Sequence, residues 1–159
     1  MKLSEQTVSI LKNFSTINQN LVIKQGSEIS TMSAMKNIVS KSKVDETFPV
    51  EFAIYDLNEF LSAMSLFTNP ELDFDDNFVL ITEAGSNDTS LKYWYSEPSV
   101  VTTPSKEVTM PSVEVEFPMN SDILSEVQRA AAVIGAPDMV LEDDELRVSK
   151  RSIYATKIT

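Results

Sequence analysis

Two stretches of the chain carry apolar residues at the spacing of one helical face, and they constrain the fold more than any other feature. The first follows Ser4 and runs to about Ile17, and the second follows Asp56 and covers residues 57–67. Ser and Asp side chains cap helices by accepting a hydrogen bond from a free backbone N–H. The apolar stripes are Leu3, Thr7, Ile10, Leu11 and Phe14, and Leu57, Phe60, Leu61, Met64 and Phe67. We therefore expect two amphipathic helices.

The segments between and after these helices predict short strands. They alternate or are rich in β-branched and aromatic residues, and turn residues separate them. The expected strands are residues 21–24, 28–33, 37–43, 49–55, 72–74, 78–82 and 89–95. We expect the first two to form a hairpin across residues 25–27, and the first four to be arranged as a β-meander. The predicted fold class is α+β, with antiparallel sheets.

Residues 98–111 predict a linker, because they contain three prolines and a polar run. A first domain then covers residues 1–97 and a second covers residues 112–159. The second domain is expected to begin with a strand at 113–117, followed by a helix that Ser121 caps. The apolar stripe of this helix is Ile123, Val127, Ala130 and Ile134. A hairpin of residues 139–141 and 146–149 and a strand at 152–158 are expected to follow. These elements together amount to half of the first domain, so we expect a truncated chain or an unusually small, partial second domain.

The 159 residues include neither cysteine nor histidine. This excludes disulfides, thiolate zinc sites and imidazole general bases, and we expect no metal and no cofactor. Phosphate-cradling glycine motifs and the serine-hydrolase motif are absent from the sequence. No apolar run approaches the roughly 18 residues of a membrane span, and the N-terminus lacks a signal segment, so we expect a cytosolic protein with no membrane partner.

The formal net charge is −11, but the charge is unevenly distributed. Residues 1–43 hold six lysines and two glutamates, a net of +4, whereas residues 44–159 hold seven basic and 22 acidic side chains, a net of −15. Such a split is typical of a protein in which one surface meets a polyanion. On charge alone, however, we favour the alternative of a solvated surface on which lysine is unevenly used.

Three runs of residues carry a family resemblance: Lys2-Leu3-Ser4, Leu11-Lys12-Asn13-Phe14 and Ala53-Ile54-Tyr55-Asp56-Leu57-Asn58. With the strand pair between them, they resemble the N-terminal domain of the sliding clamps of T-even-type bacteriophages, which are DNA polymerase processivity factors. The resemblance implies the DNA-clamp fold, with two similar domains per subunit, sheets outside and helices on one face lining a central channel. It also implies a homotrimeric ring around duplex DNA.

The resemblance further implies a non-enzymatic protein in the cytoplasm of an infected bacterial host. Its expected partners are DNA polymerase, a clamp-loader ATPase and late-transcription factors. Short partner peptides would dock on apolar residues near the linker, which here are Val100, Val101, Val108 and Met110. Alternatively, these side chains are held by their own domain.

A ring that slides needs a channel that attracts DNA without holding any single phosphate tightly. A few basic side chains over a face of small polar groups meet that requirement. The predicted DNA-facing residues are Lys2, Lys12, Asn58, Ser62 and Arg129. An exposed lysine needs no function, however, so a solvated helix position is the alternative for each basic residue.

Other interpretations of the sequence are less well supported. Residues 73–77 have the acidic spacing of a calcium loop, but Phe78 and Ala84 stand where the loop requires Gly and Glu. The run Tyr93-Trp94-Tyr95 predicts core aromatics together with an edge or subunit contact rather than base stacking. The alternative function is an acidic protein-interaction or DNA-mimic module that does not encircle DNA. A carboxylate-based hydrolase lacks paired acids in any pocket-like pattern.

Overall fold

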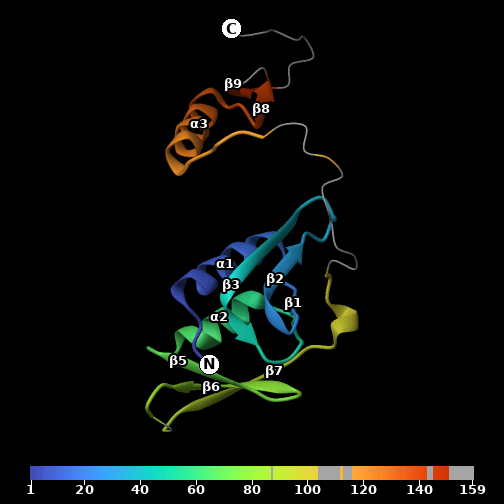
Figure 1. Ribbon diagram of the computed structural model, residues 1–159, viewed down its shortest axis with the longest axis vertical. Coiled ribbons are helices and arrows are strands. Elements are labelled where there is room, and N and C mark those ends of the chain that lie inside the picture. The colour runs from blue at the N-terminus through green and yellow to red at the C-terminus, as the bar shows by residue number, and fades with distance from the viewer. Residues whose placement is uncertain (87, 104–111, 113–115, 143–144, 151–159) are drawn as a thin grey trace. The chain divides into compact units, whose positions relative to one another are not determined.

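The computed structural model describes residues 1–86, 88–103, 112, 116–142 and 145–150. The chain forms two compact units, Met1–Thr109 and Met110–Thr159 (Figure 1). Below they are called unit 1 and unit 2. Some of the predicted elements lie outside the described residues. They are residues 104–111 of the linker, residues 113–115 of one predicted strand and the whole predicted strand at 152–158.

The first helix, α1, spans Glu5–Ile17 and begins as predicted. Ser4 is its N-cap, and the Ser4 hydroxyl accepts a hydrogen bond from the backbone N–H of Thr7 at 3.2 Å. The stripe faces inward, because Thr7 and Leu11 are 0% exposed and Phe14 is 2% exposed. Helical periodicity in the sequence therefore predicted both the element and its buried face.

The second helix, α2, spans Leu57–Ser65, and Asp56 caps it as predicted. The Asp56 carboxylate accepts hydrogen bonds from the backbone N–H groups of the two residues that follow Leu57. Phe60 and Met64 are buried with the stripe of α1 in one hydrophobic core. The two helices also pack directly against each other.

Strand pairing in the first half of unit 1 differs from the prediction. β1 (Leu21–Ile23) pairs with β4 (Phe52–Ile54), whereas β2 (Gly26–Met32) pairs with β3 (Val39–Phe48), in both cases antiparallel. The hairpin predicted across residues 25–27 and the β-meander predicted for the first four strands are therefore wrong. Every residue of β1 and β4 is buried, so both faces of each strand are covered by apolar side chains. Each of the two strands supplies the hydrogen-bonding neighbour of the other. β2 and β3 are less buried than β1 and β4. β2 is exposed near its start and buried near its end, and most residues of β3 are exposed or half-buried.

A three-stranded meander completes unit 1, and its three strands lie where strands were predicted. β5 (Pro70–Phe74), β6 (Phe78–Glu83) and β7 (Ser90–Trp94) lie in the order β5-β6-β7, all antiparallel. A short 3-10 helix, η1 (Pro98–Val100), follows. One face of this sheet contributes Leu72 and Ile81 to the core shared with α1 and α2, so both helices are held on one hydrophobic body.

In unit 2, α3 spans Ser121–Ile134, and β8 (Asp138–Glu142) pairs with β9 (Glu145–Ser149) as the predicted hairpin. The predicted cap is displaced by one residue. Asn120, not Ser121, has extended backbone, and its side chain accepts a hydrogen bond from the N–H of Ile123 at 2.8 Å. Gly135 ends the helix at φ +62°, a left-handed conformation that favours glycine.

The core predicts a large difference between two identical substitutions. Leu11→Ala removes a side chain that is 0% exposed and is expected to lower the free energy of unfolding of unit 1 by about 2–5 kcal/mol. Leu66→Ala removes a side chain that is 71% exposed, and its effect is expected to stay within about 0.5 kcal/mol. Urea unfolding of both variants tests this, and equal effects would contradict the assigned core.

Candidate nucleic-acid interface

The outward faces of α1 and α2 form one polar surface, which we call the helix surface. Because the two helices contact each other and bury their stripes in one core, their exposed faces lie on the same side of unit 1. Its exposed residues are Glu5, Gln6, Ser9, Lys12, Asn13 and Thr16 from α1, and Asn58, Glu59, Ser62 and Ser65 from α2. The exposed Lys2 immediately precedes α1. Of the predicted DNA-facing residues, the structure thus brings Lys2, Lys12, Asn58 and Ser62 to one region.

This helix surface is weakly charged. The surface holds Lys12, Glu5 and Glu59, and the adjacent Lys2 brings the formal charge of the region to zero in a chain whose net charge is −11. It therefore lacks the acidic excess of the rest of the protein. A neutral surface with two separated ammonium groups is compatible with weak, non-specific attraction to a phosphate backbone.

Hydroxyl groups on the helix surface are largely occupied by the helices themselves. Ser62 donates to the carbonyl of Asn58 and Ser65 to that of Ser62, both at 2.7 Å. Thr16 on α1 donates to the carbonyl of Asn13, also at 2.7 Å. A hydroxyl that donates to its own helix has no proton left for a phosphate oxygen, so these side chains cover the surface without offering strong anchoring points.

The start of α1, and with it Lys2, is fixed by contacts to two strands. The N-terminal ammonium of Met1 donates to the carbonyl of Leu72 at 2.6 Å, and the N–H of Leu72 donates to the carbonyl of Met1 at 2.7 Å. On the other side of Lys2, the N–H of Ser4 and the hydroxyl of Thr7 both donate to the carboxylate of Glu46 on β3. Lys2 therefore projects from a backbone segment that is held at both ends.

The carboxyl of Glu46 has a pKa below its ordinary value of 4.5. Burial opposes ionisation, but the hydrogen bonds from Thr7 and Ser4 favour the charged form and outweigh it. The carboxylate also lies at the N-terminus of α1, where negative charge is favoured. Glu46 is a positioning residue for the helix surface, and its partners lie 39 and 42 residues away in sequence, so no local motif indicated it.

Other predicted site residues lie elsewhere. Arg129 is exposed on α3 in unit 2, on the side of the helix opposite its apolar stripe. Val100 is 59% exposed, whereas Val101 is buried against Val22 and Ala53. The burial of Val101 favours the alternative that a linker residue is held by its own domain. Val108 and Met110 lie outside the described residues.

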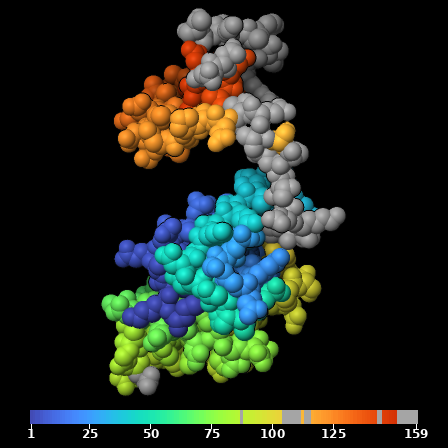
Figure 2. Space-filling model, in the orientation of Figure 1, coloured from blue at the N-terminus to red at the C-terminus, as the bar shows by residue number. Residues whose placement is uncertain are grey.

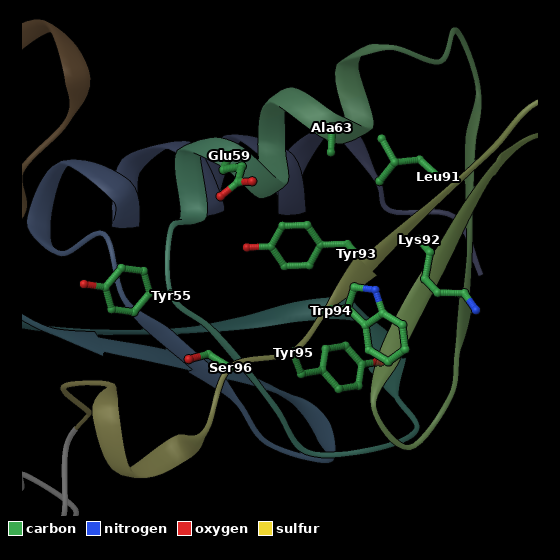
Figure 3. Close-up of a pocket in the computed structure, with 9 residues that line it drawn as sticks. All are labelled: Tyr55, Glu59, Ala63, Leu91, Lys92, Tyr93, Trp94, Tyr95 and Ser96. Carbon is green, nitrogen blue, oxygen red and sulfur yellow. The ribbon is translucent and has the colours of Figure 1, made fainter.

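An aromatic pocket lies between α2 and β7, and the sequence did not predict it. Its volume is about 570 Å³, and its lining residues are Tyr55, Glu59, Ala63, Leu91, Lys92, Tyr93, Trp94, Tyr95 and Ser96. Figure 3 shows Tyr93 projecting from β7 beneath α2, on the side where Glu59 and Ala63 lie. Alternation along a strand predicts that Tyr93 and Trp94 point to opposite faces of β7. It does not predict that α2 covers the side chain of Tyr93.

Two phenols of this pocket, those of Tyr93 and Tyr95, have a raised pKa. Burial, reinforced by the negative charges of Glu59 and Asp56, raises the pKa of Tyr93 to about 12. Burial, reinforced by Asp75, raises the pKa of Tyr95 to about 12. Neither the Tyr93 nor the Tyr95 phenol can serve as a general base at neutral pH. Within the described part of the chain, no group of three or more acidic side chains is placed to hold a metal ion, and no helix is long and apolar enough to cross a bilayer.

The fold and the helix surface together define a class: an α+β protein of antiparallel sheets whose two packed helices expose a polar, weakly charged surface. A family model described as DNA polymerase processivity factor matches residues 2–92. The chain is also 37% identical over 147 residues to the sliding clamp of Vibrio phage KVP40, covering 91% of this chain and 66% of that protein. It is 30% identical over 135 residues to the sliding clamp of Enterobacteria phage T4, covering 82% of this chain and 57% of that protein.

The chain therefore belongs to the DNA polymerase processivity factor family. Its α+β architecture agrees with the predicted clamp fold class. The chain spans between 57% and 66% of the length of these curated relatives. The family match covers most of unit 1, so the helix surface lies within the part of the chain that the comparison identifies.

The Glu46 contacts predict a pH-dependent contribution to stability. Because the pKa of Glu46 in the folded protein is lowered, its ionised form stabilises the fold above the ordinary value of 4.5, and this contribution is lost as the pH falls through the folded-state pKa. Glu46→Gln is expected to destabilise unit 1 by about 1 kcal/mol at pH 7, comparable to the loss of a helix cap. The difference from the unsubstituted chain is expected to shrink below pH 4.5.

Chemical unfolding at several pH values between 7 and 3 measures this difference. Glu51→Gln is the matched control, because the Glu51 side chain is exposed, and it is expected to have little effect at any pH. A difference for Glu46→Gln that stays constant down to pH 3 would show that the ionised carboxylate is not the source of the stabilisation.

Proposed function

We propose that this protein acts as a DNA sliding clamp, a non-enzymatic processivity factor that encircles duplex DNA and tethers the replicative polymerase. The observation that carries the proposal is the helix surface, a polar and weakly charged region in a strongly acidic chain of the processivity factor family. Residues 1–97 would form the first clamp domain, residues 98–111 the linker and residues 112–159 part of a second clamp domain. Four of the five predicted DNA-facing residues lie on or beside the helix surface, and Arg129 would contribute from unit 2.

Sliding sets two requirements that act against each other. The channel must not repel the duplex, and it must not form phosphate contacts strong enough to act as friction. Lys2 and Lys12 provide attraction that acts over a Debye length of about 8–10 Å at physiological salt. The hydroxyls of Ser62 and Ser65 already donate to helix carbonyls, so they offer few competing anchors. Retention then comes from topology rather than affinity.

Partner and subunit contacts follow from the same proposal. The chain would assemble as a homotrimer, be loaded by a clamp-loader ATPase and bind DNA polymerase, with late-transcription factors as further partners in the cytoplasm of the infected bacterium. The exposed Val100, together with Val108 and Met110, would form an apolar surface on which partner peptides bind. The aromatic pocket beside β7, the last strand in the order β5-β6-β7, supports a subunit contact there, because Trp94 is 63% exposed.

The helix surface predicts which lysines affect DNA binding. Lys2→Glu combined with Lys12→Glu is expected to weaken binding to duplex DNA and to lower the slope of log K against log salt by about 2, because each phosphate that a lysine neutralises contributes about 0.9. Lys24→Glu combined with Lys43→Glu is the matched control, because it makes the same change in net charge at exposed positions that lie outside α1 and α2. Fluorescence anisotropy across a salt series measures both slopes. An equal loss of affinity in the two double variants would mean that only net charge matters.

Encirclement predicts a topological signature. The full chain, loaded by a clamp loader on nicked circular duplex, is expected to remain bound at high salt and to be released when the circle is linearised. Gel filtration of the DNA-bound fraction before and after cutting measures this. Release by salt alone would indicate ordinary electrostatic binding, and failure to associate with DNA at all would favour the acidic protein-interaction module.

A further inference from the structure

The chain that follows β7 lies on the surface of unit 1, and we call its residues 96–102 the strap. The N–H of Ser96 donates to the carbonyl of Ala53 at 2.9 Å, which pairs the start of the strap with β4. After η1, Val101 is 7% exposed and is buried with Val22 and Ala53. Figure 2 shows this part of the chain, in yellow, at the surface of unit 1. The strap therefore covers part of the β1 and β4 pair.

Two asparagines in the turn between α1 and β1 hold the end of the strap. The side-chain Nδ2 of Asn18 donates to the carbonyl of Thr102 at 3.4 Å, and the Oδ1 of Asn20 accepts from the N–H of Thr102 at 3.5 Å. Both backbone groups of Thr102 are thus bound by side chains of one turn. These distances are longer than those of typical N–H···O hydrogen bonds, so each contact is weak by itself.

Shorter hydrogen bonds fix the two asparagines themselves. Asn18 Nδ2 also donates to the carbonyl of Met32 at 2.7 Å, and Asn18 Oδ1 accepts from the N–H of Asn20 at 2.9 Å. Asn20 Nδ2 donates to the carbonyl of Tyr55 at 2.6 Å. An amide side chain can donate and accept at once, so each asparagine binds the rest of unit 1 and the strap together. The asparagines are held tightly, and they in turn hold the strap loosely.

The two ends of the strap are held unequally. Ser96 is bound to the backbone of a buried strand residue at 2.9 Å, whereas Thr102 is bound by the two longer contacts. Of the strap residues, all of which the structure describes, only Val101 is buried, and it lies in a small cluster apart from the main core. A segment with so few buried apolar contacts opens at a lower free energy than the core around it. We therefore expect opening to begin at Thr102.

We propose that the strap opens and closes on folded unit 1, and that Asn18 and Asn20 are the positioning residues that hold it closed. In the closed state Val101 is covered, while the neighbouring Val100 is 59% exposed. Opening exposes both valines and uncovers the face of β1 and β4 on which the strap lies. The strap thereby regulates how many apolar side chains are available to partner peptides. Only this last step rests on the proposed function, because the opening itself requires neither DNA nor a partner.

Thiol labelling of the full chain tests the proposal, because the sequence contains no cysteine and a single introduced thiol reports one position. Val100→Cys, Val101→Cys and Val79→Cys make the same substitution at an exposed strap position, a buried strap position and a position in the main core that is 0% exposed. The rate of reaction with N-ethylmaleimide is measured by mass spectrometry. The Val101→Cys thiol is expected to react about tenfold more slowly than that of Val100→Cys and about tenfold or more faster than that of Val79→Cys, which needs unfolding of the core.

Substitutions of the asparagines test their part in closing the strap. Asn20→Ala is expected to raise the labelling rate of the Val101→Cys thiol about fivefold, as for the loss of one hydrogen bond, and to leave the rate of the Val79→Cys thiol unchanged. Asn18→Ala is expected to act in the same direction. Asn13→Ala is the matched control, because it removes an exposed asparagine of α1 outside the turn, and it is expected to change neither rate.

Three results would overturn the proposal. If the Val101→Cys thiol reacts as slowly as that of Val79→Cys, the strap opens only when unit 1 unfolds. If it reacts as fast as that of Val100→Cys, the strap is not closed in solution. If Asn20→Ala raises the Val101→Cys and Val79→Cys rates equally, or raises neither, the asparagine does not hold the strap. None of these readouts involves DNA or a partner, so the failure of this proposal and that of the clamp function remain distinguishable.

Discussion

The burial of the α1 and α2 stripes in one core is the interaction on which the rest of unit 1 depends. Leu11, Phe14 and Phe60 are each at most 2% exposed, and the sheets are built around the same cluster. An amphipathic helix that buries one face must present the other, so this packing determines which side chains reach solvent. The presence of Lys12, Asn58 and Ser62 on one surface is therefore a consequence of hydrophobic packing and needs no contact among those residues.

Sequence reasoning succeeded where the determining interactions are local. A helix stripe, the caps at Ser4 and Asp56, and the positions of strands β5, β6 and β7 each depend on residues within a few positions of one another. It failed for β1, whose partner β4 lies about 30 residues further along the chain. Three consecutive buried residues in each strand were visible in the sequence as apolar runs, but such runs do not specify which strand pairs with which.

The same distinction separates the two parts of the candidate site. Spacing alone placed Lys12, Asn58 and Ser62 on outward helix faces. By contrast, the contact of Glu46 with the start of α1 and the covering of Tyr93 by α2 are products of tertiary structure, and no motif signals them. The neutrality of the helix surface could have been predicted by counting Glu5 and Glu59 together with the lysines, once both helices were assigned to one side.

The charge distribution makes physical sense under the proposed encirclement. A chain with net charge −11 repels duplex DNA over most of its surface, so affinity alone could not keep it on the template. A ring removes that requirement, because a duplex inside it is released only when the ring opens or the DNA ends. The channel then needs only to avoid repulsion, and a surface on which Lys2 and Lys12 offset Glu5 and Glu59 does so. A more basic surface would bind more tightly but would slow the sliding that a processivity factor requires.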